Sequence, residues 1–331
     1  MKTLFKAVAT TALVAAAVFA APQFASSGQA QDFKGPVRIV VPFAPGGTSD
    51  ILARMIAPKL SDAIKTTVVV ENKPGAAGNL GAEAVAKAKP DGHTLLLMDV
   101  GNLSTAPSLF PDLNFDIQKD LAPVGLVMFG PYVLAVHPSV GVTNPKELIA
   151  YAKANPGKLA VANSGVGAVN HITAVQMAKA LGIEWKNVPY KGGAAASRAV
   201  ISGESNTIIN GTTATLPFVA NKQLVGIAVT GDERLPSAKD LPTFKEAGWP
   251  ANDAGTWQGL MTTGGTPAPV VNKLNAELKK ILAEPDVQAK IAEQGGVVKA
   301  GSPDDFKTWL AASVKTWGGV IKENGIKPAN D

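Results

Sequence analysis

Val37-Arg-Ile-Val-Val-Pro-Phe-Ala-Pro-Gly-Gly-Thr-Ser-Asp50 is the stretch that decides the fold, since it predicts a strand, a glycine turn and a helix in succession. Residues 39–41 form an uninterrupted apolar run, which is typical of a buried parallel strand. Gly46 and Gly47 permit turn angles that other residues avoid, and residues 48–50 are typical of a helix start. A helix N-terminus presents unpaired amide groups to an anion, so this turn is suited to hold one. A purely structural turn with nothing bound is the alternative.

The first thirty residues predict export. Lys2 and Lys6 precede an apolar run over residues 7–21, and small residues offer cleavage after Ala20 or after Ala30. This is the pattern of a secretory signal peptide, and the run is too short for a membrane span. We therefore expect residues 1–30 to be a signal peptide and the mature chain to be soluble and exported.

Composition excludes several classes of site. The chain contains no cysteine, so it has no lipid-modified N-terminal cysteine, disulfide, thiolate metal site or cysteine nucleophile. The formal net charge is +5, without a basic run or a basic-aromatic cluster, and no nucleic-acid partner is expected. The roughly 300 residues left after cleavage are ample for a core and more natural as two lobes than one.

Strand and helix signals alternate along the chain, which predicts an α/β fold with mainly parallel sheets. Residues typical of helix starts occur at Asn144, Thr243, Pro267 and Ser302. Short buried strands are predicted at 67–70, 94–98, 132–136, 159–162, 207–210 and 224–229.

Turn-rich breaks at residues 129–131 and 248–255 predict two lobes joined by two crossings, an arrangement that permits hinge closure over a cleft. The predicted organisation is the signal peptide 1–30, lobe 1 at 31–130, lobe 2 at 131–252 and a return segment of lobe 1 at 253–331.

A second strand, glycine turn and helix start occurs over residues 159–170, so each lobe offers a helix N-terminus. Two such ends facing a cleft suit a ligand with two separated acid groups. Tyr190, followed by Lys191-Gly-Gly, supplies a ring wall and an open backbone. Ordinary partial burial is the alternative for this tyrosine. Asp50 is expected to cap the helix or order its loop, because it would repel an anion.

Eight separated motifs occur in one order along the chain. They are Val41-Pro-Phe-Ala-Pro-Gly-Gly-Thr-Ser-Asp50, Val70-Glu-Asn-Lys-Pro-Gly-Ala-Ala-Gly-Asn79, Lys89-Pro-Asp-Gly-His-Thr94, Tyr151-Ala-Lys-Ala-Asn-Pro-Gly157, Ser164-Gly-Val-Gly167 with His171, Val188-Pro-Tyr-Lys-Gly-Gly193, Leu241-Pro-Thr-Phe-Lys-Glu-Ala-Gly248 and Gly265-Thr-Pro267. Together they closely resemble the Bug family, the periplasmic substrate-binding proteins of tripartite tricarboxylate transporters. The resemblance covers residues 35 to 328.

The resemblance implies a periplasmic protein with a two-lobed type II binding-protein fold that closes over a small organic acid and delivers it to the membrane subunits of the transporter. In that family, ligand carboxylates are held by backbone amides, hydroxyls and bridging waters. The ligand-binding residues that it implies are Phe43, Gly46, Gly47, Thr48, Ser49 and Asn102 in the first lobe, and Ser164, Gly165, Gly167, Ala168, His171, Tyr190, Gly192 and Thr212 in the second.

The sequence departs from the family pattern where ligand identity would be set. Ala168 stands where many members carry serine or threonine, and residues 99–105 and 209–213 are also unusual. Which acid binds therefore stays open: dicarboxylates, tricarboxylates, aromatic acids, acidic amino acids and a neutral amide are all candidates. A monomer is favoured.

Enzyme classes fit less well. Gly165-x-Gly167-x-x-Asn170 resembles a dinucleotide turn, but Asn170 replaces the third glycine. There is no Gly-x-Ser-x-Gly elbow, and the three histidines are scattered without paired acids at metal-ligand spacing. We expect a binding protein without catalytic residues, metal or cofactor. A protein that presents its closed form to a sensor kinase is the alternative.

Overall fold

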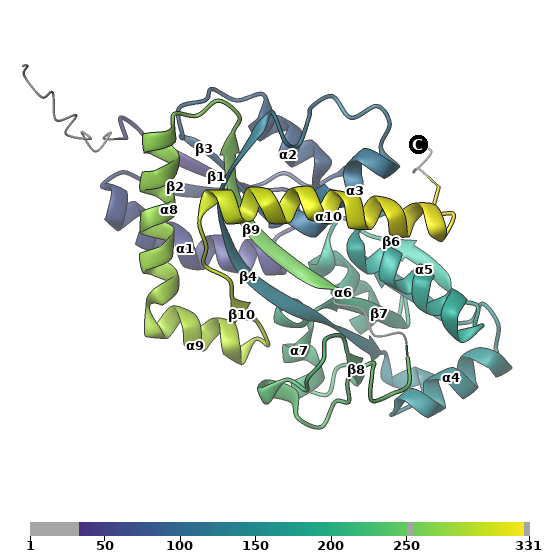
Figure 1. The fold of residues 1–331 in the computed structure, drawn as a ribbon. Helices are drawn as coiled ribbons and strands as arrows, with labels where there is room; N and C mark the ends of the chain where they lie inside the picture. Colours follow the sequence, from purple (N-terminus) through teal and green to yellow (C-terminus); the bar gives the residue numbers. More distant parts are fainter. Residues whose placement is uncertain (1–32, 250–253, 328–331) are drawn as a thin grey trace, which may run out of the picture. The chain divides into compact units, whose positions relative to one another are not determined.

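The computed structural model describes residues 33–249 and 254–327 (Figure 1). The predicted signal peptide and part of the predicted second crossing, residues 250–253, lie outside the described residues.

One mixed sheet has the strand order β2-β1-β3-β9-β4-β7-β5-β6, and β8 and β10 pair with β4. The strands are β1 (Val37–Val41), β2 (Val68–Asn72), β3 (Thr94–Asp99), β4 (Leu121–Val136), β5 (Ala160–Asn163), β6 (Lys186–Pro189), β7 (Thr207–Gly211), β8 (Val225–Val229), β9 (Gly255–Thr263) and β10 (Val297–Val298).

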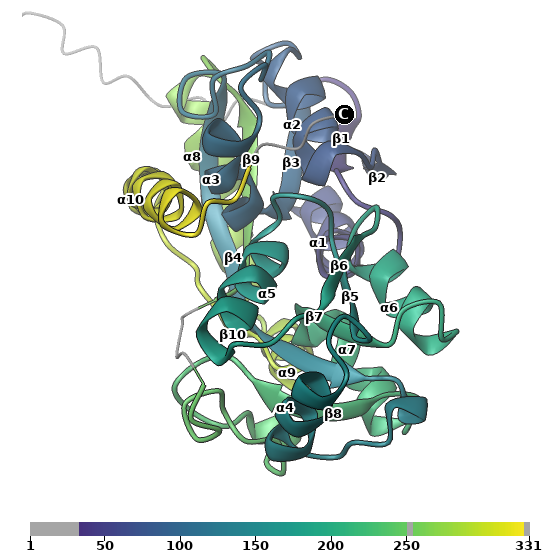
Figure 2. The same ribbon diagram turned by 90° about the vertical axis from the view of Figure 1, so that its right-hand side faces the viewer.

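Strand β4 crosses between two groups of strands (Figure 2). Its residues 121–131 pair with β9, and its residues 132–136 pair with β7 and β8. We call the part built on β1, β2, β3, β9 and residues 121–131 the first lobe, and the part built on β5 to β8 and residues 132–136 the second lobe. The expected break at residues 129–131 is thus a continuous strand.

Parallel pairing is confined to the outer strands of each lobe. Strand β1 is parallel to β2 and β3, and β5 is parallel to β6 and β7. The pairs of β9 with β3 and β4, and of β4 with β7 and β8, are antiparallel. The expectation of mainly parallel sheets is therefore wrong at the centre of the sheet, because β9 and β4 run antiparallel to their neighbours.

The described helices flank these strands. They are α1 (Thr48–Ile64), α2 (Asn79–Ala86), α3 (Val100–Leu109), α4 (Pro145–Ala154), α5 (Val169–Leu181), α6 (Gly193–Ile201), α7 (Thr212–Ala220), α8 (Ala268–Ala283), α9 (Pro285–Glu293) and α10 (Pro303–Glu323), with short 3-10 turns at Ala76–Gly78, Pro138–Val140 and Pro236–Ala238. None of them is both long and apolar enough to span a membrane.

Of the helix starts predicted at Asn144, Thr243, Pro267 and Ser302, three are confirmed. Asn144 caps α4, Pro267 precedes α8, and Ser302 forms a reciprocal capping box with Asp305 at α10. The fourth is wrong: Thr243 and Glu246 exchange the same pair of hydrogen bonds, but they close a turn. Gly248, with φ at 72°, turns the chain two residues later.

Each lobe has its own apolar core. Ile39, Leu96 and Phe306 belong to the first, and Leu134 and Ile209 to the second. A small cluster of Leu109 on α3, Ile172 on α5 and Ile321 on α10 packs the lobes against each other. The long C-terminal helix α10 thereby contacts both lobes.

Candidate ligand-binding site

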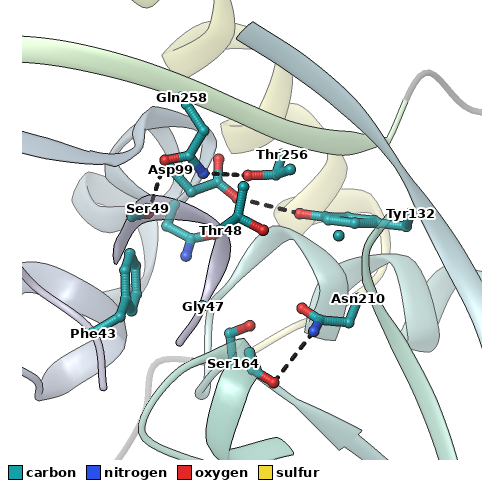
Figure 3. Close-up of a pocket in the computed structure, with 13 residues that line it drawn as sticks. Phe43, Gly47, Thr48, Ser49, Asp99, Tyr132, Ser164, Asn210, Thr256 and Gln258 are labelled. Atoms are coloured by element: carbon teal, nitrogen blue, oxygen red, sulfur yellow. Dashed lines mark hydrogen bonds between the residues drawn. The ribbon is translucent and has the colours of Figure 1, made fainter. Parts of the chain in front are cut away.

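A pocket lies between the lobes, at the end of β1 and at the point where β4 crosses (Figure 3). The space between its walls is about 380 Å³ when the part open to solvent is included. It is lined by Phe43, Gly47, Thr48, Ser49, Asp99, Asn102, Tyr132, Ser164, Gly193, Asn210, Gly211, Thr256 and Gln258.

The loop before α1 is held by Asp50. Its Oδ2 accepts from the Gly46 amide at 2.8 Å, and Arg54 and Asn72 donate to the same carboxylate. Burial by itself raises the pKa of this carboxyl group, but these hydrogen bonds outweigh burial and leave the pKa of Asp50 below its usual value. Asp50 therefore orders the loop, as the sequence suggested, and does not line the pocket.

Three helix N-termini without side-chain caps meet the pocket. Helix α1 begins after Gly47, α6 after Gly192 and α7 after the lining residue Gly211, and none of them has a side-chain cap. Both Gly47 and Gly193 line the pocket. Amide groups at such ends are unsatisfied within the helix and favour negative charge.

At the N-terminus of α5, which the sequence favoured as the second anion site, the first amide is already bonded within the protein. Asn102 Oδ1 accepts from the Val169 amide at 3.0 Å, across the two lobes. The Thr105 hydroxyl reaches Gly167 O at 2.7 Å, and the Ala44 amide donates to Lys191 O at 3.2 Å. The lobes are therefore in hydrogen-bonded contact beside the pocket.

The predicted ligand-binding residues separate into three groups. Six of them line this pocket: Phe43, Gly47, Thr48, Ser49, Asn102 and Ser164. Gly165, Tyr190 and Gly192 line an adjoining hollow, which Phe43 and Ser164 share. Gly46, Gly167, Ala168, His171 and Thr212 line neither.

The members of the third group have other partners. The Gly46 amide is bound to Asp50, Ala168 is fully buried, and Thr212 donates to Gly295 O. His171 Nδ1 accepts from the Gly167 amide at 3.2 Å, and burial lowers the pKa of this histidine. The hydroxyl of Tyr190, in the second group, bonds to Glu204 and Ser205 instead of the pocket.

Gly193 and Gly211 also line the pocket and fall in residues 190–193 and 211–213, where the resemblance implies further contacts. Five lining residues were not predicted from the sequence: Asp99, Tyr132, Asn210, Thr256 and Gln258. A signal existed for Asp99 and Asn210, because residues 99–105 and 209–213 depart from the family pattern. Thr256 and Gln258 lie on β9, a strand that the sequence did not predict.

Ser164 and Asn210 form the polar wall of the second lobe. Ser164 Oγ accepts from Asn170 Nδ2 at 3.0 Å, which leaves its own hydrogen available to an acceptor. Asn210 Nδ2 is directed at Gly193 O, Ser197 and Thr215.

Across the described part of the chain, no group of three or more histidine, cysteine, aspartate or glutamate side chains could hold a metal ion.

Two lobes joined by a crossing strand, with a polar pocket between them, define the class of two-lobed solute-binding proteins. Residues 52–326 match the model of the tripartite tricarboxylate transporter family receptor, and the chain belongs to that family. It is a binding protein and not an enzyme.

Relatives and solved structures agree with this assignment. The chain is 32% identical to protein BugT of Bordetella pertussis over 315 residues, which cover 95% of each chain. The solved structure of the periplasmic binding protein BugD matches this one with a TM-score of 0.85 and a sequence identity of 35%. The match covers 89% of this chain and 99% of BugD. Rpa4515 of R. palustris, solved with adipate, is 32% identical with a TM-score of 0.86 and the same coverage. MatC of Rhodopseudomonas palustris, solved with bound malate, is 30% identical with a TM-score of 0.82, covering 87% and 100%.

Proposed function

We propose that this protein is a periplasmic solute-binding protein that captures a small carboxylate between its lobes and delivers it to the membrane subunits of a tripartite tricarboxylate transporter. The observation that carries the proposal is the pair of uncapped helix N-termini, those of α1 in the first lobe and α6 in the second, that meet at one pocket. Such ends bind carboxylates through backbone amides without a cationic side chain. Adipate and malate in the two related structures are ligands of this kind.

In this proposal the open protein binds the acid first on one lobe, and closure completes the site. Lobe 1 comprises residues 31–130 and 253–331, lobe 2 comprises residues 131–252, and residues 1–30 are the signal peptide removed on export. The closed form is stabilised only by the contacts that the ligand adds in that state. Membrane subunits recognise the closed surface.

A thermal-shift screen of the mature protein tests this proposal. The panel contains mono-, di- and tricarboxylates, amino acids and nicotinamide cofactors. A ligand at about 100 times its dissociation constant stabilises the folded state by about 2.7 kcal/mol, which is readily measured. We expect a shift with at least one acid and none with the cofactors. A response to a cofactor alone would contradict the proposal.

A further inference from the structure

A carboxyl group forms part of the pocket wall. Asp99, at the end of β3, is only 7% exposed and lines the pocket. Its Oδ1 accepts from the amides of Gly101 and Trp257, each at 3.1 Å, and is fully used. Its Oδ2 has a longer contact, 3.4 Å from the Tyr132 hydroxyl (Figure 3).

The protein supplies Asp99 with neutral donors only. Besides the two amides and Tyr132, the Thr256 hydroxyl donates to it. Thr256 is oriented for this by Gln258, which donates to its Oγ1 and accepts in turn from Ser49. None of the ion pairs among the described residues includes Asp99. Burying a carboxylate without a counter-charge costs free energy that neutral donors offset only in part at Asp99, whereas a proton or a cation would remove that cost.

The other parts of the wall are suited to negative charge. Gly47 and Gly193 mark the uncapped helix starts, and Ser164 has a free hydroxyl hydrogen. These groups would donate hydrogen bonds to a carboxylate of the ligand. A second ligand carboxylate beside Asp99 would be repelled, or would force Asp99 to be protonated.

We propose that Asp99 binds a protonated nitrogen of the ligand, so that this protein selects small acids that also carry an amino group. The inference rests on the proposed function and narrows its substrate class. The ammonium group would supply the missing counter-charge and a donor to Oδ2. The ring of Tyr132, which lines the same wall, would add an attractive face for the cation.

The test compares acids that differ only at the amino group. Dissociation constants are measured at pH 8 by calorimetry for L-glutamate and glutarate, L-aspartate and succinate, and L-2-aminoadipate and adipate. We expect the wild-type protein to bind the amino member of at least one pair tenfold or more tightly than its partner. This comparison uses the unaltered protein and does not depend on the folding of a variant.

Asp99→Asn then assigns the preference to this side chain. The amide oxygen still accepts from Gly101 and Trp257, while the negative charge is lost. We expect the affinity for the amino acid to fall at least tenfold and that for the plain acid to rise. Asp62→Asn on the exposed face of α1 makes the same change in net charge and should alter neither.

The possible results separate the two proposals. If every plain acid binds as tightly as its amino partner or more tightly, the role of Asp99 is overturned. The proposed function as a carboxylate-binding protein then still stands. An amino preference that is unchanged in Asp99→Asn also overturns that role. Absence of binding to any acid overturns both proposals.

Discussion

The hydroxyl of Thr105 on α3 reaches the carbonyl oxygen of Gly167, 2.7 Å away at the start of α5, and so connects the two lobes. Both groups are buried, and Thr105 is not among the residues that line the pocket. The contact therefore acts on how the lobes meet and not on the ligand directly.

Thr105→Val is expected to weaken ligand binding. Valine has a similar shape but donates no hydrogen bond. The single hydroxyl hydrogen of Thr105 is shared between Gly167 O at 2.7 Å and Asn102 O at 2.8 Å, so the buried carbonyl of Gly167 loses a partner when the lobes are together, at a cost of about 1 kcal/mol. We expect about a fivefold rise in the dissociation constant, measured by calorimetry. Thr173→Val is the matched control, because that buried hydroxyl bonds only to Val169 O within α5. Equal losses of affinity in both variants would contradict the bridging role.

Ser164→Ala tests a direct contact with the ligand. Ser164 Oγ accepts a hydrogen bond from Asn170, and its hydroxyl donates none to the other residues that the structure describes. Loss of a charge-assisted hydrogen bond should weaken binding by about 1–3 kcal/mol, or roughly five- to 150-fold. Ser202→Ala, at an exposed serine after α6, should leave affinity unchanged. Unchanged affinity in Ser164→Ala would remove this residue from the site.

The local turn at residues 46–50 could be predicted from the sequence because its signals are contiguous. Glycine, helix-start residues and an apolar stripe follow one another, and α1 begins at Thr48 as expected. The role of Asp50 was also readable, since a carboxylate four residues after Gly46 can close the loop on itself. Such inferences need no knowledge of distant residues.

The wall around Asp99 could not be predicted, because it is assembled by long-range pairing. Strand β9 brings Thr256 and Gln258 beside Asp99, and its polar and glycine-rich sequence lacks the apolar run of a typical core strand. Likewise, the sequence favoured the helix start at the end of residues 159–170 as the anion site of the second lobe. Only the position of Asn102, far away in the sequence, closes the turn at α5 and leaves the one at α6 open.

Gly211→Ala tests how closely the lobes approach. A Cβ at this position would lie 3.0 Å from Thr48 Oγ1 and 3.1 Å from Thr256 Cγ2, both on the first lobe. The backbone angles of Gly211 are open to alanine, so the effect should come from the contact alone. We expect affinity to fall by about 1–3 kcal/mol, as for other overpacked contacts, with little change in the melting temperature of the free protein.

Gly319→Ala on α10 is the control for that variant. The glycine is exposed, and an added Cβ would meet nothing within 4 Å. Alanine in a helix should raise stability by about 0.5–1 kcal/mol without changing the dissociation constant. If Gly211→Ala binds as tightly as Gly319→Ala, the lobes do not close on Gly211 when the ligand binds.

The carboxyl group of Asp99 should make the ligand-free protein less stable as pH rises. Burial, only partly offset by hydrogen bonds, raises its pKa to about 7, compared with about 3.9 in an unfolded chain. Between these values the folded protein keeps a proton that the unfolded chain has released. Stability therefore falls by up to about 1.4 kcal/mol per pH unit and levels off above pH 7.

Tyr132, the titratable side chain in contact with Asp99, stays neutral because burial and Asp99 itself raise its pKa well above the usual value. Urea unfolding of the wild type and of Asp99→Asn at pH 5, 6, 7 and 8 isolates this effect, since the other groups are common to both. We expect the difference in unfolding free energy to move in favour of the variant up to pH 7. A difference that is constant over this range would mean that Asp99 is already ionised at pH 5 and that its buried charge is stabilised by the protein alone.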